Sequence, residues 1–114
     1  MPAWYTGHMD ISALFQCRSI AIIGASRDQK KVGHHILKSL QKNSKLELFP
    51  INPHAETLLG LRTFASLKEL PHSADIAIIA VPSAVVESVV DECVQTHVKA
   101  VIIITSGFAE NGKD

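Results

Sequence analysis

Short runs of apolar residues alternate along the chain with segments whose apolar residues recur at helical spacing. Successive apolar positions are typical of strands in a parallel sheet, because both faces of such a sheet are covered. This pattern predicts strands at residues 20–23, 46–51, 76–81 and 100–104. Two amphipathic stripes, from Val32 to Leu40 and from Val85 to Val94, predict helices between them.

Weaker signals predict smaller features, two of them between the second and third of these strands and one after the third. Residues 61–64 are expected to form a short edge strand. Ser66 and Glu69 have capping-box spacing, with the serine at the cap, and predict a helix of one or two turns that Pro71 ends. Ser83 is expected to cap the helix that follows residues 76–81.

The alternation of strands and helices predicts an α/β fold built from right-handed βαβ units. The expected architecture is a Rossmann-like three-layer fold with a parallel sheet in the strand order 3-2-1-4-5. Helices must cover both faces of such a sheet, and the chain ends at Asp114, where the helix after the last strand should begin. We therefore expect a fold truncated after its last strand, as a fragment of a longer protein.

The first residues differ from the rest of the chain. Residues 1–8 show no periodicity and precede a second methionine, so we interpret them as a leader or an expression remnant. Residues 9–114 are then one domain, and its opening residues Ile11, Leu14 and Phe15 are expected to pack on it because they have helical spacing.

Charge and cysteine content narrow the classes of function. The chain has 114 residues, and its 11 Lys and Arg balance 11 Asp and Glu. Nucleic-acid binding and polybasic membrane anchoring usually need a basic surplus, so neither is expected. The apolar runs are far shorter than the ~20 residues that span a bilayer. Cys17 and Cys93 are too few for a disulfide framework, which favours a reduced, cytoplasmic protein.

A candidate ligand site follows the first strand. Ligands of parallel α/β sheets bind beyond the carboxyl ends of the strands, near the point where the strand order reverses. Residues 24–27 (Gly-Ala-Ser-Arg) occupy this place, and Val32-Gly33 begins the next helix. A glycine lets a phosphate approach the backbone, and a helix start offers unpaired N–H groups. Arg27, Lys30 and Lys31 add positive charge, so this loop is predicted to bind phosphate.

The same loop does not match the dinucleotide fingerprint. The spacing G-x-G-x-x-G would need glycines where Ser26 and Gln29 stand. The second strand ends in Asn52-Pro53-His54, without the acidic residue that binds the ribose of NAD. Both absences count against an NAD(P)-binding domain of an oxidoreductase, which stays as the weaker alternative. A ligand with a phosphorylated ribose remains compatible with this strand end, because no acidic residue is there to repel it.

No catalytic or metal-binding residue is predicted. No spacing of cysteine and histidine resembles a zinc site. Cys93 falls on an apolar stripe and is expected in the core, and Cys17 has no paired base that would make it a nucleophile. Each of the six histidines is expected at the surface or at a cap: His8, His34, His35, His54, His72 and His97.

Several short segments together resemble the N-terminal CoA-binding domain of the NDP-forming acyl-CoA synthetases. This superfamily includes ADP-forming acetate–CoA ligase, the succinyl-CoA synthetase alpha subunit and related protein lysine acetyltransferases. The resemblance covers residues 11–114. Its segments, in order, are residues 19–27, Lys31-Val32-Gly33, residues 50–53, Leu59-Gly60-Leu61, Ala80-Val81-Pro82 and Ser106-Gly107-Phe108-Ala109-Glu110.

The resemblance implies a site for CoA or acyl-CoA. It puts the CoA phosphates on the loop after the first strand, the adenosine at the end of the second, and the pantetheine arm near the last. His54 stands where the family often has a lysine. The implied site residues are Gly24, Ala25, Ser26, Arg27, Lys31, Val32 and Gly33 for the phosphates, Asn52, Pro53 and His54 for the adenosine end, Val81 and Pro82 along the ligand, and Ser106 and Gly107 for the pantetheine.

The resemblance also implies what the chain does not do by itself. In the family's ligases the phosphorylated histidine and the nucleotide site lie in other domains, and none of the six histidines maps to that histidine. The implied function is a CoA-binding module that is non-catalytic in isolation. Its partners would be the remaining domains or a subunit of an ADP-forming acid–CoA ligase or an acyltransferase. A regulatory CoA-sensing domain is an alternative. A homodimer through the open sheet face is expected, and the alternative is that Ile11, Leu14 and Phe15 fold back over part of that face and leave a monomer.

Overall fold

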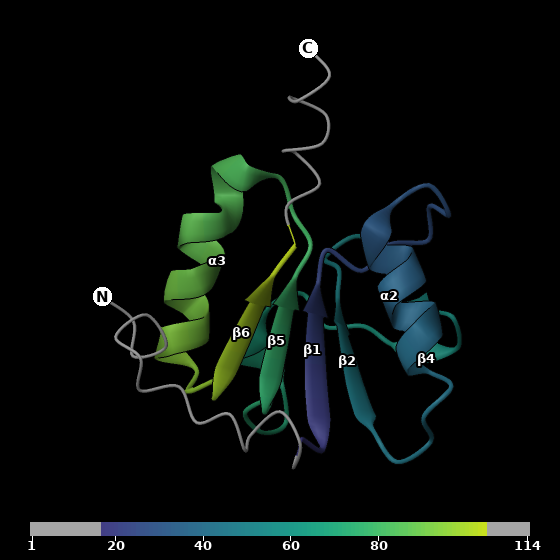
Figure 1. Ribbon diagram of the computed structural model, residues 1–114, viewed down its shortest axis with the longest axis horizontal. Coiled ribbons are helices and arrows are strands. Elements are labelled where there is room, and N and C mark those ends of the chain that lie inside the picture. Colours follow the sequence, from purple (N-terminus) through teal and green to yellow (C-terminus); the bar gives the residue numbers. More distant parts are fainter. Residues whose placement is uncertain (1–16, 105–114) are drawn as a thin grey trace.

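A parallel sheet of four strands, with helices on both faces, forms the described part of the chain (Figure 1). The structure is a computed structural model and describes residues 17–104. The strands are β1 (Ser19–Ile23), β2 (Glu47–Ile51), β5 (Ile76–Ile79) and β6 (Ala100–Ile103), in the order β2-β1-β5-β6. This confirms the Rossmann-like α/β fold, and the order matches strands 2-1-4-5 of the prediction.

The predicted edge strand lies beside β2 but pairs differently from the expectation. Its first half is β4 (Leu61–Arg62), which pairs antiparallel with β3 (Thr57–Leu58). Phe64 then makes an isolated parallel bridge to Ile51, in which its N–H donates to the carbonyl of Pro50 at 2.9 Å. Pro50 lacks the N–H that the preceding ladder bond would need, so the pairing does not extend back along β2.

The two predicted helices cover opposite faces of the sheet. Helix α2 (Val32–Leu40) buries Leu37 against one face, and α3 (Ser83–Gln95) buries Val90 and Cys93 against the other. A single 3-10 turn, η2 (Leu67–Glu69), packs on the same face as α3. Each helix follows a strand and returns antiparallel to it, so both begin at the carboxyl edge of the sheet (Figure 1).

Two cap predictions have different outcomes. The Ser66 side chain accepts a hydrogen bond from the Lys68 N–H at 3.3 Å and so caps η2 as expected. Ser83 was expected to cap α3, and this is wrong: Pro82 is the N-cap and Ser83 is the first helical residue. The extended ψ of Pro82 turns the chain into the helix without a side-chain hydrogen bond.

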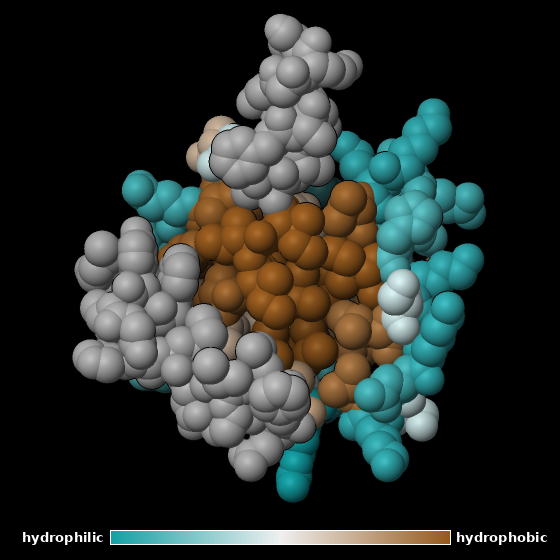
Figure 2. Space-filling view, in the orientation of Figure 1, coloured by the Kyte–Doolittle hydropathy of each residue, from teal (hydrophilic) through white to brown (hydrophobic). Residues whose placement is uncertain are grey.

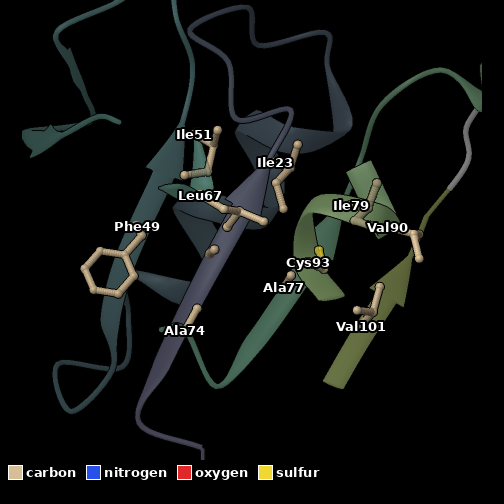
Figure 3. Packing of buried hydrophobic residues seen from close by; sticks show 11 residues of the cluster. Ile23, Phe49, Ile51, Leu67, Ala74, Ala77, Ile79, Val90, Cys93 and Val101 are labelled. Atoms are coloured by element: carbon tan, nitrogen blue, oxygen red, sulfur yellow. The ribbon is translucent and has the colours of Figure 1, made fainter. Parts of the chain in front are cut away.

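The larger core lies between the sheet and α3, where Ile23, Ile79 and Val101 pack with Val90 and Cys93 (Figure 3). Cys93 is 1% exposed, as expected for a core residue. Its burial, with a smaller effect from the Glu92 charge, raises the pKa of the thiol to about 12. We therefore expect the thiol to be protonated at neutral pH and slow to react in the folded chain.

Within residues 17–104, α2 covers only part of the sheet face on which it packs. Apolar side chains gather there over β6, β5 and β1, beside α2 (Figure 2). Ile102 and Ile104 lie on this face by the alternation of the strand and are 39% and 36% exposed. No helix within residues 17–104 is long and apolar enough to cross a membrane. The expectations for residues 1–8 and for Ile11, Leu14 and Phe15 lie outside the described residues.

Candidate functional site

Three loops meet at the carboxyl edge of the sheet, and they contain most of the predicted site residues. The loop after β1 runs from Gly24 to the N-cap of α2, Lys31. The loop after β2 begins at Asn52, and the loop after β5 leads through Val81 to Pro82. Ser106 and Gly107, expected at the pantetheine arm, lie outside the described residues.

Gly24 is required by the chain's own backbone. It has a φ of +98°, and a Cβ there would overlap the carbonyl oxygen of Ala80 and lie 3.2 Å from Cγ1 of Val81. A side chain at Gly24 would therefore collide with the loop after β5, whatever binds outside. The same close approach brings the loops after β1 and β5 together, at the point where the strand order reverses.

Gly33 brings the start of α2 onto the loop. A Cβ at Gly33 would overlap the carbonyl oxygen of Gly24 and lie 3.2 Å from Cα of Ala25. The N–H groups of Val32 and Gly33, in the first turn of α2, have no protein acceptor among residues 17–104. The helix N-terminus therefore directs unpaired donors and the positive end of its dipole toward this loop.

Residues 26–31 form a folded turn that carries positive charge. The Ser26 hydroxyl oxygen accepts from the Asp28 N–H at 3.0 Å, which leaves the Ser26 O–H able to donate. The Asp28 carboxylate accepts from the Lys30 N–H at 2.9 Å, and the Asp28 carbonyl accepts from the Lys31 N–H at 2.9 Å. Arg27, Lys30 and Lys31 are exposed and form no ion pair within the described residues.

Asn52 joins the end of β2 to the loop after β1. Its Nδ2 donates to the carbonyl of Ala25 at 3.0 Å, and its Oδ1 accepts from the His54 N–H at 2.7 Å. Both polar ends of this side chain are therefore used inside the protein, so Asn52 holds the site in shape. An open hollow of about 450 Å³ lies beside it, lined by Asn52, Pro53, Ala55, Glu56, Thr57, Arg62, Thr63 and Ala65.

His34 is the site residue that the sequence interpretation missed. A surface or capping role was expected, but the residue is only 6% exposed and its Nδ1 lies 2.9 Å from the carbonyl oxygen of Ser26. Its spacing of three residues from the buried Leu37 was the available signal, because the two share one face of α2.

The other described histidines support the original expectation. His35, His54, His72 and His97 are all exposed. Among the described residues, no group of three histidine, cysteine or carboxylate side chains could hold a metal ion.

A larger hollow, of about 860 Å³, opens at the amino edge of the sheet and carries Arg18, Lys45 and Lys99. The Asp75 carboxylate accepts hydrogen bonds there from the N–H groups of Arg18 and Ser19, at 2.8 and 3.2 Å. It also forms an ion pair with Nζ of Lys99 at 3.4 Å, so these donors already have an anionic partner. The Arg18 N–H is the main cause that lowers the pKa of Asp75. Burial, with a smaller effect of Asp75, raises the pKa of the Cys17 thiol, which argues against a nucleophile at this edge.

Comparison with known proteins identifies the family of the chain. The model of a family described as "CoA binding domain" matches residues 18–113. Acetate–CoA ligase [ADP-forming] II of Archaeoglobus fulgidus is 40% identical over 105 residues, which are 91% of this chain and 16% of the relative. The alpha subunit of acetate–CoA ligase [ADP-forming] II of Pyrococcus furiosus is 41% identical over 100 residues, 88% of this chain and 22% of the relative.

Solved structures give the same relationship. The dinucleotide-forming acetyl-coenzyme A synthetase 1 of Ca. Korarchaeum cryptofilum, in complex with phosphate and ADP, aligns with a TM-score of 0.81 and 40% identity. The alignment covers 92% of this chain and 23% of that one, so the chain spans less than a quarter of the length of these ligases. A family match over nearly all described residues, together with this fold, shows that the chain belongs to the CoA-binding domain family, in the form found in ADP-forming acyl-CoA synthetases.

Proposed function

We propose that this domain binds coenzyme A at the carboxyl edge of its sheet, with the CoA phosphates on the loop between β1 and α2. The observation that carries the proposal is a set of unpaired donors. The N–H groups of Ala25, Ser26 and Arg27 have no protein acceptor among residues 17–104, and those of Val32 and Gly33 share this property. Backbone donors grouped in this way are suited to phosphate oxygens.

The charge of the same loop supports an anionic ligand. The exposed cations of the loop, Arg27, Lys30 and Lys31, outnumber its single carboxylate, Asp28. That carboxylate accepts a hydrogen bond from the Lys30 N–H, so it stabilises the loop itself. A polyphosphate therefore meets a surface of net positive charge.

The rest of the ligand follows from the positions of the neighbouring loops. The hollow beside Asn52 and Pro53 is our proposed place for the adenosine end. The exposed His54 follows Pro53 in the chain and is a further proposed contact of that end. Val81, partly buried against the core, and the exposed Pro82 would lie along the ligand toward the pantetheine arm. Ser106 and Gly107 stay as proposed contacts of that arm.

The activity of the whole protein is a further part of the proposal. The ligases that this chain resembles are several times longer, so we propose that residues 9–114 supply CoA binding to an ADP-forming acid–CoA ligase. Catalytic groups would come from its other domains or from a partner subunit. The free thiols of Cys17 and Cys93 are compatible with a cytoplasmic location.

Self-association is the second proposal for partners. Ile102 and Ile104 are exposed on the apolar face beside α2, and a second copy could bury them in a two-fold dimer (Figure 2). Sedimentation at micromolar concentration should then show a dimer that Ile102→Ser weakens. Val94→Ser is the matched control, because Val94 is 53% exposed on α3. A single species of monomer mass in the unchanged chain would contradict the dimer.

Calorimetric titration with CoA and with NADH tests the ligand. We expect CoA to bind more tightly than NADH, since the loop lacks the dinucleotide glycines and β2 lacks an acidic end. Lys31→Gln should raise the dissociation constant for CoA about fivefold or more, because a charged donor to phosphate is lost. Lys45→Gln, a change of an exposed lysine at the opposite edge, is the control. Tighter binding of NADH than of CoA would overturn the proposal.

A further inference from the structure

Three consecutive carbonyl groups of the loop after β1 are each fixed by a different protein group, the first by close packing and the next two by side-chain hydrogen bonds. The carbonyl oxygen of Gly24 lies against Gly33, close enough that a Cβ there would overlap it. The carbonyl of Ala25 accepts from Asn52 Nδ2 at 3.0 Å. The carbonyl of Ser26 lies 2.9 Å from His34 Nδ1. The path of the loop is thus fixed at three successive peptide units.

Holding a carbonyl also fixes the N–H group of the next residue. In a trans peptide unit, the C=O of one residue and the N–H of the next point in opposite directions, and the structure has no cis peptide among its described residues. The held carbonyls of residues 24–26 therefore direct the N–H groups of residues 25–27 away from the groups that hold them. These are the N–H groups without a protein acceptor.

We propose that His34 is a positioning residue for coenzyme A: by donating from Nδ1 to the Ser26 carbonyl, it turns the Arg27 N–H toward the CoA phosphates. The proposal rests on the proposed function, and it gives a buried histidine a role in ligand binding without contact to the ligand. A carbonyl oxygen only accepts, so Nδ1 of His34 must carry the proton of this hydrogen bond.

The position of His34 makes this interaction rigid. The residue is 6% exposed, and it lies one position after Gly33 in the first turn of α2. The hydrogen bond joins residues eight positions apart, so it ties the helix start to the middle of the loop. Without it, the peptide unit between Ser26 and Arg27 would be free to rotate, and CoA binding would have to restore its orientation.

Two substitutions separate the hydrogen bond from the bulk of the side chain. His34→Asn keeps an amide donor near the position of Nδ1, whereas His34→Leu fills similar space without a donor. His35→Leu is the matched control, because His35 is the exposed neighbour in the same helix. We expect His34→Leu to weaken CoA binding about tenfold, and His34→Asn and His35→Leu to stay within about threefold of the unchanged chain.

A spectroscopic measurement tests the hydrogen bond without ligand. A long-range proton–nitrogen correlation spectrum of the free chain should show His34 as the Nδ1–H tautomer, and the Nε2–H tautomer would overturn the proposal. Equal CoA affinity of His34→Leu and the unchanged chain would also overturn it, while leaving the proposed function intact. Failure of the unchanged chain to bind CoA would overturn the proposed function and this inference together.

Discussion

Replacing Asn52 with alanine should loosen the junction between the end of β2 and the loop after β1. Asn52 makes two side-chain hydrogen bonds, from Nδ2 to the Ala25 carbonyl at 3.0 Å and to Oδ1 from the His54 N–H at 2.7 Å. Ala25 is 3% exposed, so water would not readily replace the lost donor at its carbonyl. The substitution should therefore lower both the stability of the fold and the affinity for CoA.

Asn43 provides a matched control for the magnitude. Its Oδ1 accepts from the Lys45 N–H at 3.0 Å, the same local turn that Asn52 makes with His54. Unlike that of Asn52, its amide nitrogen donates to no other loop within residues 17–104. Asn43→Ala should lower the free energy of unfolding by about 0.5 kcal/mol, and Asn52→Ala by about 2 kcal/mol, since it also leaves a buried carbonyl without a donor. In urea the midpoint should fall by about 1 M for Asn52→Ala and by about 0.3 M for Asn43→Ala.

Calorimetric titration with CoA completes this test. Asn52→Ala should raise the dissociation constant about tenfold, because the Ala25 peptide unit loses its fixed orientation, and Asn43→Ala should leave it unchanged. Equal losses of stability in the two variants would refute the importance of the bond to Ala25. A large loss of stability with unchanged CoA affinity would refute the link between Asn52 and the ligand site.

Three further predictions concern packing, thiol chemistry and pH. Gly33→Ala should lower the free energy of unfolding, measured in urea, by about 2 kcal/mol or more, because its Cβ would overlap the Gly24 carbonyl. Gly60→Ala is strained only by its φ of +81° and should lower it by about 1 kcal/mol. Equal losses in the two variants would argue against the close approach. Cys93 should resist an aromatic disulfide reagent in the native chain and react on unfolding, and rapid native reaction would contradict its burial. The pKa of Asp75 is lower in the folded chain than in the unfolded chain, so its ionised carboxylate stabilises the fold. This stabilisation is fully present above the unfolded carboxyl pKa of about 4, and it is lost as the pH falls through the pKa of Asp75 in the folded chain. Asp75→Asn should thus lower stability by about 1 kcal/mol near neutral pH and flatten the acid side of the stability profile; an unchanged profile would contradict it.

The elements that the sequence predicted are those with a clear apolar period. The runs at β1 and β5 are buried throughout, as their pattern indicated. The stripes of α2 and α3 bury Leu37, Val90 and Cys93 but leave Val32, Val85 and Val94 exposed. In β6, Ala100 and Val101 are buried, whereas Ile102 and Ile103 are exposed. The edge beside β2 was less predictable, because the missing N–H of Pro50 limits pairing with Phe64 to a single bridge. Pro50 is visible in the sequence, but its effect on strand pairing cannot be predicted until the register of the two segments is known.

The sequence predicted which loops form the candidate site, but not the contacts that hold these loops together. Gly24 and Gly33 could be assigned to a phosphate loop from their place after a strand and at a helix start. The close approaches of Gly24 to Ala80 and of Gly33 to Gly24 depend on packing between elements. The roles of Asn52 and His34 depend on contacts over 27 and 8 positions, which one sequence does not reveal.

The central claim is that the loop between β1 and α2 holds the phosphates of coenzyme A. The most direct measurement is an amide proton–nitrogen correlation spectrum of the unchanged chain during titration with CoA. We expect saturable shifts of the Ala25, Ser26, Arg27 and Gly33 amides, with small changes at the amino edge. Shifts confined to the amino-edge residues Arg18, Lys45 and Lys99, or no shifts at millimolar CoA, would contradict the claim.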